Sequence, residues 1–242
     1  MIKRISDIIL SLVLLVSLSP IILFLSILIF VQDFHSPFYI SNRIGKNKKK
    51  FKLYKFRSMI VNADKSGVNS TSDNDKRITK LGNFLRKYKI DEIMQLLNVI
   101  KNEMSFVGPR PNVETDVKLY SLEEEKLLSV KPGITDFSSI VFSDEGEILS
   151  SSKNPDYDYN RLIRPWKSRL GLIYVRKRNF FLDLMILFLT FLNLFNRIKT
   201  LSIINSILKK IDTNTELHNI ILRKQDLKPS IAPGFTKPYE ED

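Results

Sequence analysis

The chain contains no cysteine and only two histidines, His35 and His218. A protein without cysteine has no disulfide scaffold and no thiolate chemistry, and two histidines argue against a histidine-rich zinc site. Glycine is scarce too, with eight residues among 242, and the sequence has neither a Walker A loop nor a Rossmann glycine fingerprint. These absences argue against a disulfide-bonded module, a P-loop NTPase and a dinucleotide-binding enzyme.

Positive charge predominates, with 38 Lys and Arg against 26 Asp and Glu, a formal net charge of +12. Such an excess points to a polyanionic neighbour, which is a nucleic acid, a phosphorylated ligand or an anionic lipid. The charge is densest in "RIGKNKKKFKLYKFR", residues 43–57, which contains eight basic residues and no acid. We expect a strand or hairpin there, whose cations lie on anionic headgroups or bind a phosphate.

One apolar run, Ile8 to Val31, continues for 24 residues without a charge. A straight helix of that length reaches ~36 Å, against a hydrocarbon core of ~30 Å, so it is long enough to cross a bilayer. However, Ser19-Pro20 lies at its midpoint, where proline should kink a helix. Basic residues flank both ends, and both groups favour the cytoplasmic side. These residues leave a kinked span and a re-entrant hairpin equally open.

Asp91-Glu92 is the strongest candidate for chemistry. Apolar residues from Ile90 to Met104 recur at helical spacing, which predicts a helix with Asp91 at its N-cap. Capping alone would explain an acid there. The helix start also has Arg86 before it and Arg110 after it, in a Gly-Pro-Arg-Pro turn, and this arrangement indicates a phosphate site. A carboxylate beside a phosphate is a magnesium ligand, a nucleophile or both, and two carboxylates there imply a divalent cation.

The remaining segments carry weaker signals. Phe180–Asn196 is apolar beside a basic stretch, and we expect either a helix at the membrane interface or a buried core helix. The other expectations are a loop at 62–77, a short helix at 121–129, a Pro-Gly turn running into a strand-like segment at 131–142, and a mobile polar tail after Asp212.

Taken together and in order, these pieces resemble the bacterial sugar transferases, also called monotopic phosphoglycosyl transferases. The resemblance covers roughly residues 1–197, and its most specific piece is "KIDEIMQLLNVIKNEMSFVGPRP". The others are "KRISDIILSLVLLVSLSPIIL", "NRIGKNKKKFKLYKFRSM", "VKPGIT" and "YVRKRNFFLDLMILFLT". One segment departs from the family pattern: many members continue Gly-Trp-Ala-Gln-Val after "KPGIT", whereas here the chain reads Asp136-Phe137-Ser138-Ser139-Ile140.

The resemblance implies a mainly helical α+β fold on the cytoplasmic face of the inner membrane. Residues 1–34 would form a monotopic, re-entrant helix hairpin broken at Ser19 and Pro20. Residues 35–197 would form a small catalytic domain with interfacial amphipathic helices, and residues 198–242 an amphipathic segment followed by a mobile tail.

The resemblance also implies a reaction. The enzyme would move a sugar 1-phosphate from a UDP-sugar to a membrane polyprenyl phosphate, such as undecaprenyl phosphate, and release UMP, which would begin the assembly of a surface glycan. Asp91 would be the nucleophile and a ligand of Mg²⁺, with Glu92 as its partner. Four cations would bind phosphate or nucleotide: Arg86, Arg110, Arg57 and Lys55.

The expected partners are the donor, the acceptor and membrane lipids, without nucleic acid, and a homodimer is left open. The alternative from another class is a non-catalytic, membrane-anchored basic protein that binds anionic lipid or nucleic acid.

Overall fold

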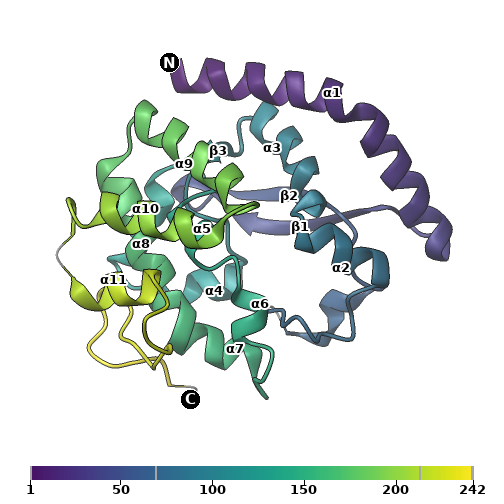
Figure 1. Cartoon of the computed structure of the whole chain (residues 1–242). Coiled ribbons are helices and arrows are strands. Elements are labelled where there is room, and N and C mark those ends of the chain that lie inside the picture. The colour runs from purple at the N-terminus through teal and green to yellow at the C-terminus, as the bar shows by residue number, and fades with distance from the viewer. Residues whose placement is uncertain (1, 69, 213, 241–242) are drawn as a thin grey trace.

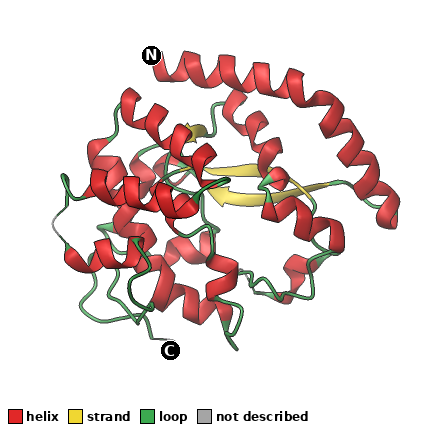
Figure 2. Cartoon of the chain, viewed as in Figure 1, coloured by secondary structure: helices red, strands yellow, loops and turns green. Residues whose placement is uncertain are grey.

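The computed structural model describes residues 2–68, 70–212 and 214–240 (Figure 1). Helices dominate, and the strands form two small two-stranded sheets (Figure 2), which confirms the expected mainly helical α+β class. The strands are β1 (Phe38–Ile44), β2 (Lys50–Phe56), β3 (Ser105–Val107) and β4 (Gly133–Thr135). The α-helices are α1 (Ile2–Asp33), α2 (Lys80–Lys87), α3 (Leu96–Ile100), α4 (Glu114–Lys118), α5 (Phe137–Val141), α6 (Glu145–Ile148), α7 (Pro155–Asp158), α8 (Arg164–Lys177), α9 (Phe180–Asn193), α10 (Arg197–Leu208) and α11 (Thr215–Ile221). Short 3₁₀ segments are η1 (Lys46–Lys48), η2 (Ala63–Ser66), η3 (Ile90–Gln95) and η4 (Glu124–Ser129), and η5 (Tyr159–Ile163) is a π-helical turn.

Helix α1 is the long apolar run, and it arches over one side of the molecule (Figure 1). The expected break at Ser19-Pro20 is absent, because both residues stay helical, and the helix bends instead. Pro20 has no N–H to donate to the Val16 carbonyl, but the Ser19 hydroxyl donates to that carbonyl at 2.7 Å. The serine therefore satisfies the acceptor that the proline leaves free. In the part of the chain that is described, only α1 is long and apolar enough to cross a membrane.

The basic stretch forms the predicted hairpin, although β1 begins at Phe38, ahead of that stretch. Strands β1 and β2 pair antiparallel, with Ile44 opposite Lys50. Phe51 and Leu53 are buried, whereas Lys50 and Lys52 are exposed, so one face packs on the core and the other carries charge.

The helix predicted from Ile90 to Met104 is shorter and differently capped. It begins as 3₁₀ segment η3, continues as α3 and ends at Ile100. Lys89, with φ 57°, occupies the N-cap position, so Asp91 lies inside the first turn and does not cap the helix. Asn102 adopts φ 68° just after Ile100, and this left-handed residue turns the chain away from the helical path.

Strands β3 and β4 run parallel and bring the Gly-Pro-Arg-Pro turn against the Pro-Gly turn. A Cβ on Gly133 would lie only 2.1 Å from the backbone nitrogen of Gly108, so this approach requires glycine. The prediction of a strand-like segment at 131–142 is wrong beyond Thr135, where β4 ends. Asp136 accepts a hydrogen bond from the Ser139 backbone N–H at 2.7 Å and so caps helix α5.

Helix α9 has two apolar faces. Leu182, Ile186 and Leu189 are buried in the core, while Phe181 and Phe188 are exposed. The prediction of a buried core helix is therefore confirmed for one face of α9. That the other face contacts a membrane interface stays a prediction.

Candidate active site

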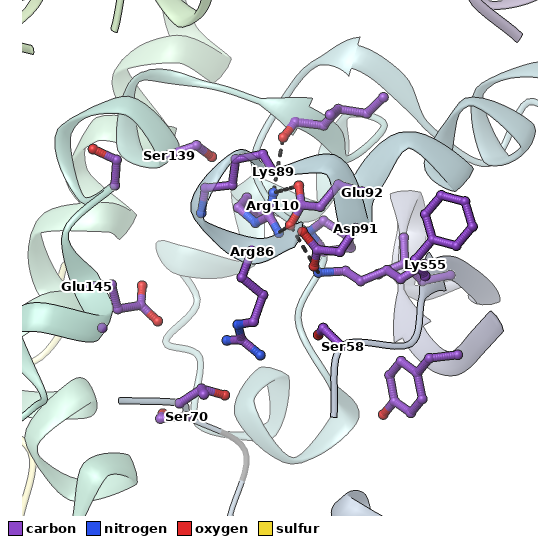
Figure 3. A pocket seen from close by; sticks show the side chains of 18 of the residues that line it. Lys55, Ser58, Ser70, Arg86, Lys89, Asp91, Glu92, Arg110, Ser139 and Glu145 are labelled. Carbon is purple, nitrogen blue, oxygen red and sulfur yellow. Dashed lines mark hydrogen bonds and ion pairs between the residues drawn. The ribbon is translucent and has the colours of Figure 1, made fainter. Parts of the chain in front are cut away.

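A cavity of about 1490 Å³ opens between the β1–β2 hairpin, segment η3 and helices α5 and α6 (Figure 3). Its lining includes all six residues that the sequence predicts for catalysis or for binding phosphate or nucleotide, and five of them face the same space (Figure 3): Lys55, Arg86, Asp91, Glu92 and Arg110. The sixth, Arg57, also lines the cavity but is bonded elsewhere. The fold thus brings the candidate carboxylates and cations into one space.

Glu92 is held tightly by two cations. Arg110 donates two hydrogen bonds to its carboxylate, at 2.5 and 2.9 Å, and Lys55 Nζ donates a third at 3.0 Å. Burial alone would raise the pKa of Glu92, but the charges of Arg110 and Lys55 outweigh it and hold that pKa well below its usual range. Glu92 is therefore an ionised carboxylate, and both of its oxygens are bound by Arg110 or Lys55.

Asp91 differs from its neighbour. Burial raises its pKa above the ordinary value, and Lys55, whose Nζ lies 3.9 Å from Oδ2, offsets this only in part. Its Oδ1 is buried and, among the described residues, has no hydrogen-bond partner. A buried polar atom without a partner costs stability, so such an atom in a cavity points to a ligand or a reacting group. Of the two carboxylates, Asp91 is the one with an oxygen that no described residue binds.

Local structure explains how these side chains meet. Lys89 in the left-handed region starts η3 abruptly and places Asp91 and Glu92 together on its first turn. Arg110 follows the Gly108–Pro109 turn and also donates to the Ile134 carbonyl at 3.0 Å, which ties it to strand β4. The turn at Lys89 and the bond to strand β4 thus position both carboxylates and Arg110.

The two other predicted arginines have different surroundings. Arg86 extends into the cavity below the carboxylates (Figure 3), and within the described ranges its guanidinium makes no hydrogen bond or ion pair. Arg57 is buried and grips Asp33 at the end of α1 through two contacts, of 2.5 and 2.6 Å. The structure thus leaves Arg86 available for an anion, whereas Arg57 fastens α1 to the domain.

Arg43 and Asp116 are among the cavity-lining residues that sequence reasoning did not single out. Arg43 is part of the basic stretch, so the sequence contains a signal for it, and its Nε donates to the Ser41 hydroxyl at 3.3 Å. Burial raises the pKa of Asp116 to about 6, although Arg43 opposes the shift. Nothing in the sequence around Asp116 marks it as part of this cavity.

Comparison with known proteins shows the family of the chain. The family model described as bacterial sugar transferase matches residues 1–197. An Aeromonas hydrophila UDP-N-acetylgalactosamine-undecaprenyl-phosphate N-acetylgalactosaminephosphotransferase is 30% identical over 192 residues, which cover 78% of this chain and 42% of that protein. A Klebsiella pneumoniae UDP-glucose:undecaprenyl-phosphate glucose-1-phosphate transferase is 36% identical, with 78% of this chain and 39% of that protein covered. The uncharacterized sugar transferase EpsL of Bacillus subtilis is 36% identical over 78% of this chain and 84% of its own length. The chain thus spans about two fifths of the first two relatives and most of the third.

Proposed function

The chain belongs to the bacterial sugar transferase family, and from this premise we propose that it moves a sugar 1-phosphate from a UDP-sugar to a membrane polyprenyl phosphate. Undecaprenyl phosphate is the proposed acceptor and UMP the leaving product, because similar proteins are named as undecaprenyl-phosphate sugar phosphotransferases. The observation that carries the proposal is the contrast within the carboxylate pair: Glu92 is fully engaged by cations, whereas Asp91 has a buried oxygen without a partner.

The reaction would proceed in two displacements. The Asp91 carboxylate attacks the phosphorus that bears the sugar, the bond from that phosphorus to the bridging oxygen breaks, and UMP leaves with the electron pair. An oxygen of the acceptor phosphate then attacks the same phosphorus, the bond to Asp91 breaks, and the carboxylate is free again. Arg86 is placed to stabilise negative charge on the transferred group, since its guanidinium faces the cavity and has no partner among the described residues.

In this scheme Glu92 does not react but holds Lys55 and Arg110 in place. Its bonds to Lys55 and Arg110 keep both cations at the edge of the site, where they face the donor's phosphates. Its ionised state also places a negative charge next to Asp91, which keeps that carboxylate more basic. A more basic carboxylate is a better nucleophile towards phosphorus.

The residues present fit a magnesium ion. No group of three or more His, Cys, Asp or Glu is clustered to hold a metal in the described ranges. Mg²⁺ is commonly bound through one or two carboxylates together with substrate phosphates and water, and Asp91 Oδ1 is an unpartnered oxygen of that kind. We therefore propose Asp91 as its protein ligand. Bound there, the ion would neutralise charge on the donor's phosphates.

Both ends of α1 are fastened to the same domain, which supports monotopic attachment. At the start, Lys3 Nζ lies 2.6 Å from Asp183 Oδ2, and Arg4 donates to the Val99 carbonyl at 2.5 Å. At the end, Asp33 is bound by Arg57. A helix whose two ends bind one domain cannot place that domain's attachment points on opposite sides of a bilayer. We propose that α1 enters and leaves on the cytoplasmic face and presents the acceptor's phosphate to Asp91.

Cysteine labelling tests this topology, because the native chain has no cysteine. We expect Ile2→Cys and Lys46→Cys to resist an impermeant thiol reagent in intact cells and to react with it after the membrane is opened. Leu122→Cys, exposed on the catalytic domain, serves as the matched control. Labelling of the Ile2 site from outside, with the Lys46 site protected, would mean that α1 spans the membrane.

A donor panel tests the activity itself. Purified protein is mixed with undecaprenyl phosphate, Mg²⁺ and single UDP-sugars, including UDP-N-acetylgalactosamine and UDP-glucose, and UMP is measured. We expect one donor class to release many UMP molecules per protein when the acceptor is present, and about one UMP per protein without it, because the first displacement needs no acceptor. If no UDP-sugar releases UMP, and the protein instead binds nucleic acid with an affinity that falls steeply with salt, the non-catalytic alternative holds.

A further inference from the structure

The described part of the segment beyond the family match, residues 198–212 and 214–240, packs on the body of the protein. Helix α10 buries Leu201, Ile204 and Leu208, and α11 buries Leu217 and Ile221, in the same core as α5 and α8. The polar stretch after Ile221 is also attached: the Ser230 N–H donates to the Arg161 carbonyl at 2.9 Å. Buried apolar residues and a backbone hydrogen bond thus attach parts of this stretch to the body, and the mobility of the tail after Asp212 stays a prediction.

Two arginines, one at each end of this C-terminal pair of helices, converge on Asp144. Arg223 donates to both carboxylate oxygens of Asp144, at 2.8 and 3.1 Å, and to the Val141 carbonyl at 2.7 Å. Arg197 Nη2 lies 2.7 Å from Asp144 Oδ2 and also contacts the Val141 carbonyl. The Arg223 guanidinium lies over the Phe142 ring, 4.8 Å from its centroid. This pair of arginines fixes the chain between α5 and α6.

That chain is a wall of the cavity. Its lining residues lie between Asp136 and Glu147 and include Ser139, Asp144 and Glu145. Ser139 and Glu145 lie across the cavity from Lys55 and Ser58 (Figure 3). Arg223 itself does not line the cavity, so it touches the wall from behind. The wall includes the segment whose sequence departs from the family pattern, which is where a difference in substrate would be expressed.

The position of the wall indicates which substrate it meets. Helix α6 lies on the side of the molecule away from α1 (Figure 1). A lipid acceptor reaches the carboxylates from the membrane, which is the side of α1, whereas a soluble nucleotide sugar reaches them from water. The wall therefore faces the part of the donor beyond its phosphates.

We propose that Arg223 is a positioning residue which, from outside the family region, braces the α5–α6 wall in the conformation that binds the donor's sugar or nucleoside. This inference rests on the proposed function and deepens it. The brace acts on donor binding, and the phosphoryl chemistry at Asp91, on the opposite side of the cavity, does not depend on it.

The test compares Arg223→Ala with Lys224→Ala, which removes the same charge from the next, exposed residue. Two readouts are needed: amide hydrogen exchange of residues 137–148, and steady-state UMP release with donor and acceptor varied separately. We expect Arg223→Ala to speed exchange in the wall and to raise the KM for the donor roughly 2- to 30-fold, with kcat and the acceptor KM as in Lys224→Ala. Arg223→Lys should restore part of the donor KM, because it keeps a charge beside Asp144.

The two readouts separate the inference from the function on which it rests. Unchanged exchange in Arg223→Ala would overturn the brace whatever the activity, since exchange needs no turnover. Faster exchange with a donor KM equal to that of Lys224→Ala would show that the wall does not bind the donor. A fall in kcat alone would also contradict the inference. A native protein that releases no UMP from any donor would overturn the proposed function, while its exchange data would still decide whether Arg223 holds the wall.

Discussion

Replacing Lys55 with methionine should move the acid limb of the pH–activity profile to higher pH. Lys55 is the cation that most lowers the pKa of Asp91, opposing the effect of burial. The proposed nucleophile must be ionised, so activity rises as pH increases through the pKa of Asp91. Without Lys55 that pKa is higher, and a higher pH is needed to reach the same activity.

The size of the shift follows from the separation of the charges. Lys55 Nζ and Asp91 Oδ2 are 3.9 Å apart, and both side chains are largely buried. Two unit charges at that distance interact by about 1 kcal/mol at the dielectric constant of water and by about 4 kcal/mol at an effective value of ~20. Since about 1.36 kcal/mol corresponds to a tenfold change in proton affinity, the acid limb should move upward by between about 0.8 and 3 on the pH scale.

The assay is kcat/KM for UMP release across the acid range, which reports groups of the free enzyme. Lys52→Met is the matched control, because it removes the same charge from the exposed face of the same strand. Glu92 should stay ionised in Lys55→Met, since Arg110 still binds it with two hydrogen bonds. An acid limb that coincides in the native protein and both variants would refute the assignment of Asp91 as the ionisable nucleophile.

Two further perturbations test the site. Gly133→Ala would place a Cβ 2.1 Å from the Gly108 backbone nitrogen, so the turn that carries Arg110 must shift by about 1 Å. We expect UMP release to fall by about 10²-fold. Gly171→Ala should stay near native activity, because its Cβ would press only on the movable side-chain end of Leu127, at 2.8 Å, and would lie at an ordinary contact distance of 3.9 Å from Pro109 Cβ. Equal activities of the two variants would contradict the positioning argument. Removal of Mg²⁺ with a chelator should abolish UMP release, and added Mg²⁺ should restore it, while full activity in chelator would leave the unpartnered oxygen of Asp91 without its proposed ligand.

Local patterns were enough to predict the elements and residues that depend on neighbours in the chain. Alternating apolar and basic residues predict the hairpin, and the Asp91-Glu92 pair and Arg110 come from one continuous stretch. The Asp136 cap is a local signal as well, but the apolar, β-branched residues after it favour a strand. The structure resolves that conflict in favour of a helix.

Long-range pairing could not be predicted in the same way. Arg57 and Lys55 lie in the same basic stretch of the sequence. Arg57 nevertheless donates hydrogen bonds to Asp33, 24 residues earlier in the chain, whereas Lys55 donates to Glu92. These long-range pairings decide which carboxylate keeps an oxygen without a hydrogen-bond partner among the described residues. The difference between Asp91 and Glu92 therefore depends on the tertiary structure and could not be read from the local sequence. Arg223 likewise finds Asp144, 79 residues before it, from a stretch whose composition resembles a mobile tail.

The central claim is a covalent phosphosugar on Asp91. The most direct measurement is the intact mass of the purified protein after brief exposure to its UDP-sugar and Mg²⁺ without acceptor. The native chain and Asp64→Asn, which removes an exposed carboxylate elsewhere in the cavity lining, should gain the mass of one sugar phosphate. That mass should map to Asp91 and disappear when undecaprenyl phosphate is added. Asp91→Asn should fold and gain no mass. Native turnover in Asp91→Asn, or an adduct on another residue, would contradict the claim.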